Sequence, residues 1–167
     1  MTNAIRILGL DPGLRRTGWA VVAIEGARLS HLAHGVIAAP DQLSLAERLL
    51  AIHRGVIDVI AAWSPDEAAI EETFVTANGS STLKLGHARA AAMLAPAAAG
   101  LPVAEYAAKV VKKALVGTGG ADKAQVGFMV ARLLPAAGPT TVDAADALAV
   151  AICHAHARRV RSLGAAA

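Results

Sequence analysis

The spacing of apolar runs constrains the fold of this chain more than any other feature of its sequence. Three short runs rich in aliphatic and β-branched side chains open the chain and are predicted to be strands at 4–11, 19–24 and 29–37. Turns are predicted at 15–18 and at Glu25-Gly26. Strands joined by such short turns pair antiparallel, so we expect the chain to begin with a three-stranded meander.

After the meander, the pattern changes to alternating helices and strands. Ser44 and Glu47 fit a capping box at the start of a helix that Pro65 ends. Further strands are predicted at 68–71 and 103–106, and further helices at 81–98, 107–116, 123–134 and 142–161. This order predicts an α/β fold with a mixed five-stranded sheet, three antiparallel strands and then parallel strands, flanked by helices. We expect one domain over residues 1–163 and a short tail over 164–167.

Length, charge and cysteine content limit the class of protein. A chain of 167 residues can form one domain with a sizeable core. The net charge of +3 is compatible with a nucleic-acid partner but does not specify one. The single cysteine, Cys153, cannot form an internal disulfide, which favours a reducing compartment. Because no signal peptide or membrane-spanning segment is predicted, we expect a cytoplasmic protein with no membrane association.

Four carboxylates stand at the ends of regular elements in remote parts of the chain. Asp11 ends the first strand, Glu71 ends the fourth, and Asp143 and Asp146 open the last helix on one face. Converging buried acids would repel one another, and a bound divalent cation removes that repulsion. Carboxylate oxygens suit Mg²⁺ or Mn²⁺. The pattern therefore predicts a metal-dependent nuclease site.

Each of these acids also has another reading. Asp-Pro-Gly at 11–13 is a good turn starter, and a similar turn opens the nucleotide-binding lobes of sugar kinases and actin-like ATPases, which are much longer chains. Glu71 and Glu72 point to opposite faces of a strand, so only one can join the site, and we expect Glu71. Acids in the first turn of the last helix suit the helix dipole, with Thr140 or Thr141 as the cap.

Aromatic and basic side chains are the remaining candidates. Phe74 lies in a turn-prone loop, where it either anchors the loop to the core or stacks on an unpaired base. Lys112 and Lys123 flank a glycine-rich stretch and either stabilise charge at a phosphate or lie on solvated helix faces. Further phosphate contacts are predicted for Arg15, Arg16, Lys109, Lys113, Arg158, Arg159 and Arg161. We expect structural roles for His154, His156 and Cys153.

Five sequence blocks, in this order, resemble one known family. They are ILGLDPG at 7–13, AIEETF at 69–74, LKLGHAR at 83–89, VGTGGADK at 116–123 and DAADALA at 143–149. Together they resemble the RuvC family of bacterial Holliday-junction resolvases, in the ribonuclease-H-like superfamily, over nearly the whole chain. The resemblance implies a ribonuclease-H-like fold and a structure-selective endonuclease. Such an enzyme resolves four-way DNA junctions by paired symmetric nicks in recombination and repair.

The resemblance also implies roles for residues and partners. It implies two Mg²⁺ ions per active site, for which Mn²⁺ can substitute, and two active-site basic residues, Lys112 and Lys123. It implies that Phe74 acts at the junction core, that the protein is a homodimer, and that RuvA and RuvB are partners. The alanine-rich helix at 81–98 is the predicted dimer contact. The catalytic, metal-binding set that it implies is Asp11, Glu71, Asp143 and Asp146.

Two alternatives belong to other classes. A RuvX-like RNA-processing nuclease shares the first acid and the glycine turn, but the Phe74 loop, Lys123 and the Asp143–Asp146 pair argue against it. A junction-binding protein without catalysis is the second alternative, and the presence of all four acids argues against it.

Overall fold

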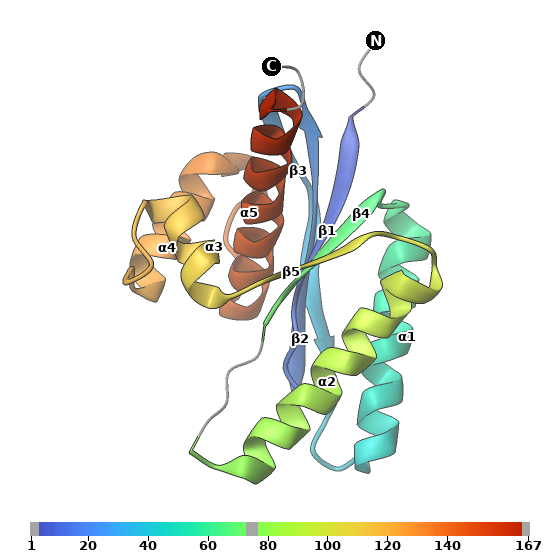
Figure 1. Ribbon diagram of the computed structural model, residues 1–167. Helices are drawn as coiled ribbons and strands as arrows, with labels where there is room; N and C mark the ends of the chain where they lie inside the picture. Colours follow the sequence, from blue (N-terminus) through green and yellow to red (C-terminus); the bar gives the residue numbers. More distant parts are fainter. Residues whose placement is uncertain (1–3, 73–76, 165–167) are drawn as a thin grey trace.

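The chain forms a five-stranded sheet between two layers of helices (Figure 1). The computed structural model describes residues 4–72 and 77–164. The strand order is β3-β2-β1-β4-β5. In chain order the elements are β1 (Ile5–Asp11), β2 (Arg16–Glu25), β3 (Arg28–Ala38), α1 (Leu45–Trp63), β4 (Glu67–Glu71), α2 (Gly79–Ala98), β5 (Val103–Tyr106), α3 (Ala108–Val116), α4 (Lys123–Leu133), the short 3₁₀ helix η1 (Pro135–Ala137) and α5 (Val142–Gly164).

The predicted order of elements and the mixed sheet are confirmed. β1, β2 and β3 pair antiparallel, whereas β4 pairs parallel with both β1 and β5. The turn predicted at 15–18 is wrong, because β2 already begins at Arg16, which pairs with Ala38 of β3. The Thr17 hydroxyl donates a hydrogen bond to the Gly13 carbonyl at 3.0 Å, which closes the turn before the strand.

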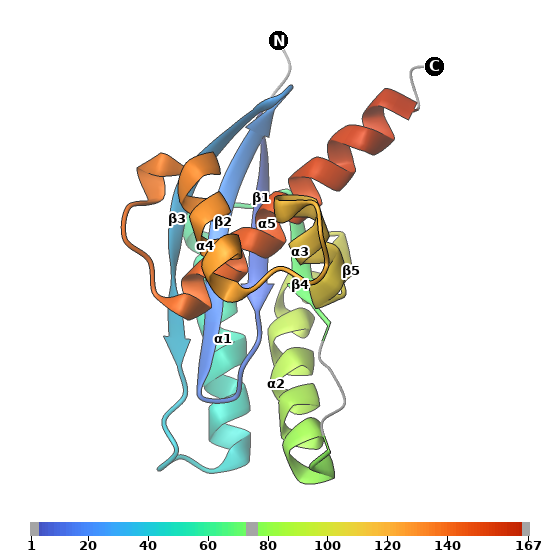
Figure 2. The same cartoon turned by 90° about the vertical axis from the view of Figure 1, so that its left-hand side faces the viewer.

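Successive side chains of β1 point to opposite faces of the sheet and contribute to two separate hydrophobic cores. Leu8 and Leu10 face α1 and α2, whereas Ile7 faces the layer that contains α3, α4 and α5. β4 alternates in the same way, with Ile70 on the first face and Ala69 on the second. Figure 2 shows α5 crossing the sheet obliquely, with α3 and α4 beside it. Odd-numbered positions of β1 and β4 therefore face α5.

Local sequence signals account for the ends of the helices. The Ser44–Glu47 capping box starts α1 as predicted, with mutual backbone and side-chain hydrogen bonds. Of the two predicted caps for α5, Thr141 is the one used, because its hydroxyl accepts a hydrogen bond from the Ala144 N–H at 3.3 Å. α5 runs to Gly164, one residue beyond the predicted domain end. Within the described ranges, no helix is long and apolar enough to cross a membrane.

Candidate active site

Strand register brings the first two candidate acids side by side. β1 and β4 are parallel, with Leu10 opposite Ile70, so the next residues, Asp11 and Glu71, end neighbouring strands at the same edge of the sheet. By the alternation of the pleat, both carboxylates belong to the face covered by α5. Glu72 is exposed, as predicted for the other member of the acidic pair.

Two glycines allow α5 to lie directly on the strands beneath it. A methyl group at Gly18 would overlap the carbonyl oxygen of Asp143, and one at Gly9 would overlap that of Ala147. Gly18 also pairs with Asp11 across the β1–β2 ladder. The first turns of α5 therefore lie close to the end of β1, and they carry Asp143 and Asp146.

The electrostatics of Asp11 show that the four acids form one cluster. The pKa of Asp11 is raised to about 7, first because the side chain is buried. The carboxylates of Glu71, Asp146 and Asp143 raise this pKa further, in that order, and the Lys123 ammonium partly opposes them. A buried acid surrounded by three others is costly to ionise unless a cation lies close by.

Glu71 shares the environment of Asp11. Burial raises its pKa first, and the Asp146 carboxylate raises it further. The ammonium groups of Lys123 and Lys112 lower it. Lys112 on α3 and Lys123 on α4 therefore act on the same carboxylate, although 11 positions separate these two lysines along the chain.

Two cations already pair with the acids of α5. Arg16 Nε lies 2.9 Å from Asp143 Oδ2, and Lys123 Nζ lies 3.1 Å from Asp146 Oδ2. The hydrogen bond to Asp146 is the largest cause of the raised pKa of Lys123. As the side chains stand, no group of three or more His, Cys, Asp or Glu residues in the described part of the chain could hold a metal ion. In this arrangement, Arg16 and Lys123 supply part of the counter-charge.

The donor set nevertheless has the chemistry of a site for a hard divalent cation. All four candidate ligands are carboxylates, which suit Mg²⁺ and Mn²⁺. Burial and the neighbouring carboxylates raise the pKa of Asp11 to about 7, so a bound cation would favour its ionised form. The side chains of Arg16 and Lys123 are 56% and 74% exposed, so either cation can move aside without unpacking the core.

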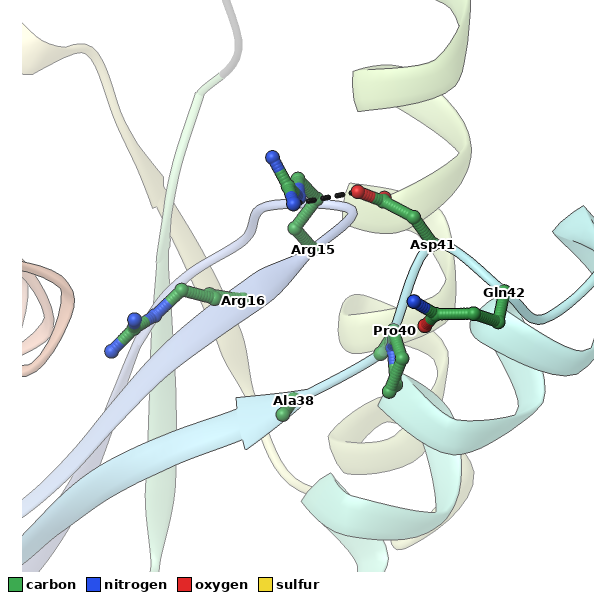
Figure 3. A pocket seen from close by; sticks show the side chains of 7 residues that line it. Arg15, Arg16, Ala38, Pro40, Asp41 and Gln42 are labelled. Carbon is green, nitrogen blue, oxygen red and sulfur yellow. Dashed lines mark ion pairs between the residues drawn. The ribbon is translucent and has the colours of Figure 1, made fainter.

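One cavity is lined by two of the four acids, and a second is lined by Arg16, which pairs with Asp143. The smaller is about 250 Å³, and its polar lining is Glu71, Lys112, Lys123 and Asp146. The larger is about 490 Å³ and lies between the β1–β2 turn and the segment after β3 (Figure 3). In the larger cavity Arg15 pairs with Asp41 at 2.6 Å, and Arg16 also lines the wall.

Lys109, Lys113 and Arg158, which were also predicted as phosphate contacts, do not belong to this acidic cluster. Lys109 and Lys113 are exposed on α3. Phe74 lies outside the described residues. Arg158, predicted as a phosphate contact, instead donates a hydrogen bond from Nε to Glu67 Oε1 at 2.8 Å.

A buried network around Glu67 was missing from the sequence prediction. His154 Nε2 lies 2.8 Å from Glu67 Oε2, and its Nδ1 lies 2.9 Å from the Tyr106 hydroxyl. Burial opposes ionisation of Glu67, but hydrogen bonds from Arg158 and His154 lower its pKa overall. The network joins α5 to the start of β4, and the predicted structural role of His154 fits it. Glu67 lies on the same face of β4 as Glu71. The alternation of side chains along the strand could therefore have placed Glu67 on the side covered by α5.

The packing role predicted for Cys153 is also consistent with the structure. Its side chain is buried in the core beneath α5. Burial raises the pKa of the thiol to about 11, which keeps it protonated at neutral pH.

Sequence comparison matches the chain to one enzyme family. The family profile described as "Crossover junction endodeoxyribonuclease RuvC" matches residues 7–154. A protein with this description from Caulobacter sp. (strain K31) is 67% identical, over 92% of this chain and 91% of its own. The corresponding protein from Maricaulis maris (strain MCS10) is 64% identical over 100% of both chains.

Two solved structures share the fold. T. thermophilus RuvC, solved in complex with a Holliday junction substrate, aligns with a TM-score of 0.87 and 35% identity, covering 95% of this chain and 97% of that one. The yeast mitochondrial Holliday junction resolvase Ydc2 aligns with a TM-score of 0.67 over 96% of this chain and 84% of its own. Its identity is 11%, so this second likeness concerns the fold alone.

Proposed function

Because the chain belongs to the RuvC family of crossover junction endodeoxyribonucleases, we propose that it resolves four-way DNA junctions by hydrolysing phosphodiester bonds in two strands. Paired, symmetric nicks in recombination and repair are the expected outcome. The observation that carries the proposal is the electrostatic cluster of Asp11 with Glu71, Asp143 and Asp146 at one edge of the sheet. RuvC proteins from Caulobacter sp. and Maricaulis maris match more than nine-tenths of this chain, which supports the same activity.

The four acids are the proposed metal ligands, with Mg²⁺ as the metal, two ions per site, and Mn²⁺ as a substitute. The raised pKa of Asp11 and the all-carboxylate donor set support this assignment. When bound, the ions would supply an activated water and offset charge on the leaving oxygen. Within the protein, Asp11 and Glu71 hold fixed positions because they end paired strands. Asp143 and Asp146 are held by the close contact of α5 with the sheet.

Lys112 and Lys123 are the proposed basic residues of the active site. Both line the smaller cavity with Glu71 and Asp146, where an ammonium group could offset charge that develops at a phosphate. Lys113 offers a matched control, because it is adjacent to Lys112 but exposed. Lys112→Met should slow cleavage by about 100-fold, whereas Lys113→Met should mainly weaken binding.

The remaining roles concern DNA and protein partners. Arg15, Arg16, Lys109 and Lys113 are proposed to contact backbone phosphates, and Phe74 to stack on opened bases at the junction core. Two active sites in a twofold homodimer would match the two strands that are cut. In α2, which is the proposed dimer contact, Leu83 is 62% exposed and Leu94 is 60% exposed. RuvA and RuvB are proposed partners in the cytoplasm, and residues 1–163 are the proposed nuclease domain.

A cleavage assay tests this function. A synthetic four-way junction and a linear duplex of the same arms are incubated with the protein in Mg²⁺, in Mn²⁺ and in EDTA. We expect paired nicks in the junction only, and only with metal present. Asp11→Asn should bind the junction with near wild-type affinity and leave it uncut. If the wild-type protein binds the junction without cutting it in either metal, the enzymatic proposal is wrong and a binding role remains.

A further inference from the structure

Arg16 lies between the acid cluster and the larger cavity. It begins β2, its Nε bonds Asp143 Oδ2 at 2.9 Å, and its side chain lines the cavity of about 490 Å³. Figure 3 shows the Arg16 side chain directed away from Asp41, to which Arg15 is bonded. Arg16 therefore reaches a candidate metal ligand with its guanidinium and also lines a space large enough for a phosphate group.

On the basis of the function proposed above, we propose that Arg16 is an exchangeable counter-ion that couples metal binding to DNA binding. Before metal binds, Arg16 holds Asp143. When a metal ion takes that carboxylate, Arg16 turns to a DNA backbone phosphate in the adjacent cavity. Metal and DNA then strengthen each other's binding through this side chain, and the coupling must be equal in both directions.

The geometry of the pair supports exchange rather than a permanent structural link. The Arg16 side chain is 56% exposed and that of Asp143 is 30% exposed, so water and salt screen the pair and it is readily broken. A divalent ion carries twice the charge of a guanidinium and prefers carboxylate oxygen. Arg16 can therefore be displaced from Asp143 without rearrangement of the backbone.

The cavity beside Arg16 suits an anion. Its carboxylate, Asp41, is already held by two guanidinium groups, from Arg15 at 2.6 Å and from Arg48 at 3.0 Å. Positive charge is therefore in excess on this wall even before Arg16 turns toward it. Guanidinium groups bind phosphate through paired hydrogen bonds, and a strand held at the acids would carry its neighbouring phosphates along this surface.

The first test measures metal binding in the absence of DNA. Mn²⁺ affinity is determined by electron paramagnetic resonance for the wild type, Arg16→Met and Arg15→Met. Arg16→Met should bind Mn²⁺ about two- to fivefold more tightly, because Asp143 loses its competing partner. Arg15→Met removes a charge from the same cavity but leaves that pair intact, so it should change Mn²⁺ affinity much less. In an Asp143→Asn background, Arg16→Met should lose its effect.

The second test measures the coupling itself. Junction affinity is measured in EDTA and in Ca²⁺, with uncut DNA verified on a denaturing gel. The increase in junction affinity on adding Ca²⁺ should be about two- to fivefold smaller for Arg16→Met than for the wild type. Any of three results would overturn the inference. They are an unchanged Mn²⁺ affinity in Arg16→Met, an Arg15→Met effect on Mn²⁺ affinity as large as that of Arg16→Met, and an equal gain of junction affinity with Ca²⁺ in the wild type and Arg16→Met. These readouts need no cleavage, so failure of the enzymatic proposal would be seen separately, in the junction-cutting assay.

Discussion

Asp11→Asn should stabilise the metal-free protein at neutral and alkaline pH. Burial, and after it the carboxylates of Glu71, Asp146 and Asp143, raise the pKa of Asp11 from its ordinary 3.8 to about 7. At about 1.36 kcal/mol per pH unit, this rise corresponds to about 4 kcal/mol. Between pH 4 and 7 the unfolded chain releases this proton and the folded chain retains it, so the free energy of unfolding falls as pH rises. Above pH 7 the penalty is complete, and asparagine, which cannot ionise, avoids it.

The assay is urea unfolding of the wild type and Asp11→Asn in EDTA at a series of pH values. The other titrating groups are common to both proteins, so the difference between the two curves reports the titration of Asp11 together with its coupling to the neighbouring charges. The stability advantage of the variant should grow by about 3 kcal/mol between pH 5 and pH 8. Mg²⁺ at pH 8 should then stabilise the wild type more than the variant. Parallel pH profiles for the two proteins would refute the conclusion that Asp11 is a buried, charge-crowded acid.

Three further changes test separate parts of the site. Lys123→Met should lower the cleavage rate by about 100-fold, with a smaller loss of junction affinity, as measured on the same labelled junction. Gly18→Ala should push the start of α5 away from β1 and destabilise the protein by about 1–3 kcal/mol in urea unfolding, with loss of cleavage, since the added methyl overlaps the Asp143 carbonyl. Glu67→Ala should cost about 2 kcal/mol in the same unfolding assay, because it leaves buried His154 without its carboxylate partner.

Most of the fold follows from the sequence because its signals are local. The capping box and the proline after the helix acted within a few positions and predicted the ends of α1. Runs of alternating or aliphatic residues predicted every strand of the sheet. The period of a strand showed that only one of Glu71 and Glu72 can join Asp11, and the parallel register of β1 with β4 places Glu71 next to Asp11. The turn predicted at 15–18 was misplaced because pairing with β3 extends the strand to Arg16.

Contacts that depend on tertiary packing were beyond the sequence pattern. Arg16 was predicted as a phosphate contact, but the position of α5 over Gly18 also brings it to Asp143. Glu67 and His154 are 87 positions apart and meet only because α5 crosses β4. Neither pairing has a local signature, since each depends on where two distant elements cross.

The most direct test of the central claim is anomalous X-ray scattering from crystals of this protein grown with Mn²⁺. We expect Mn²⁺ peaks within coordination distance of Asp11, with Glu71 and at least one of Asp143 and Asp146 turned to the ions. Arg16 and Lys123 should then no longer occupy the carboxylate oxygens that the metal takes. Mn²⁺ bound elsewhere, with Asp143 still paired to Arg16 and Asp146 still paired to Lys123, would contradict this assignment.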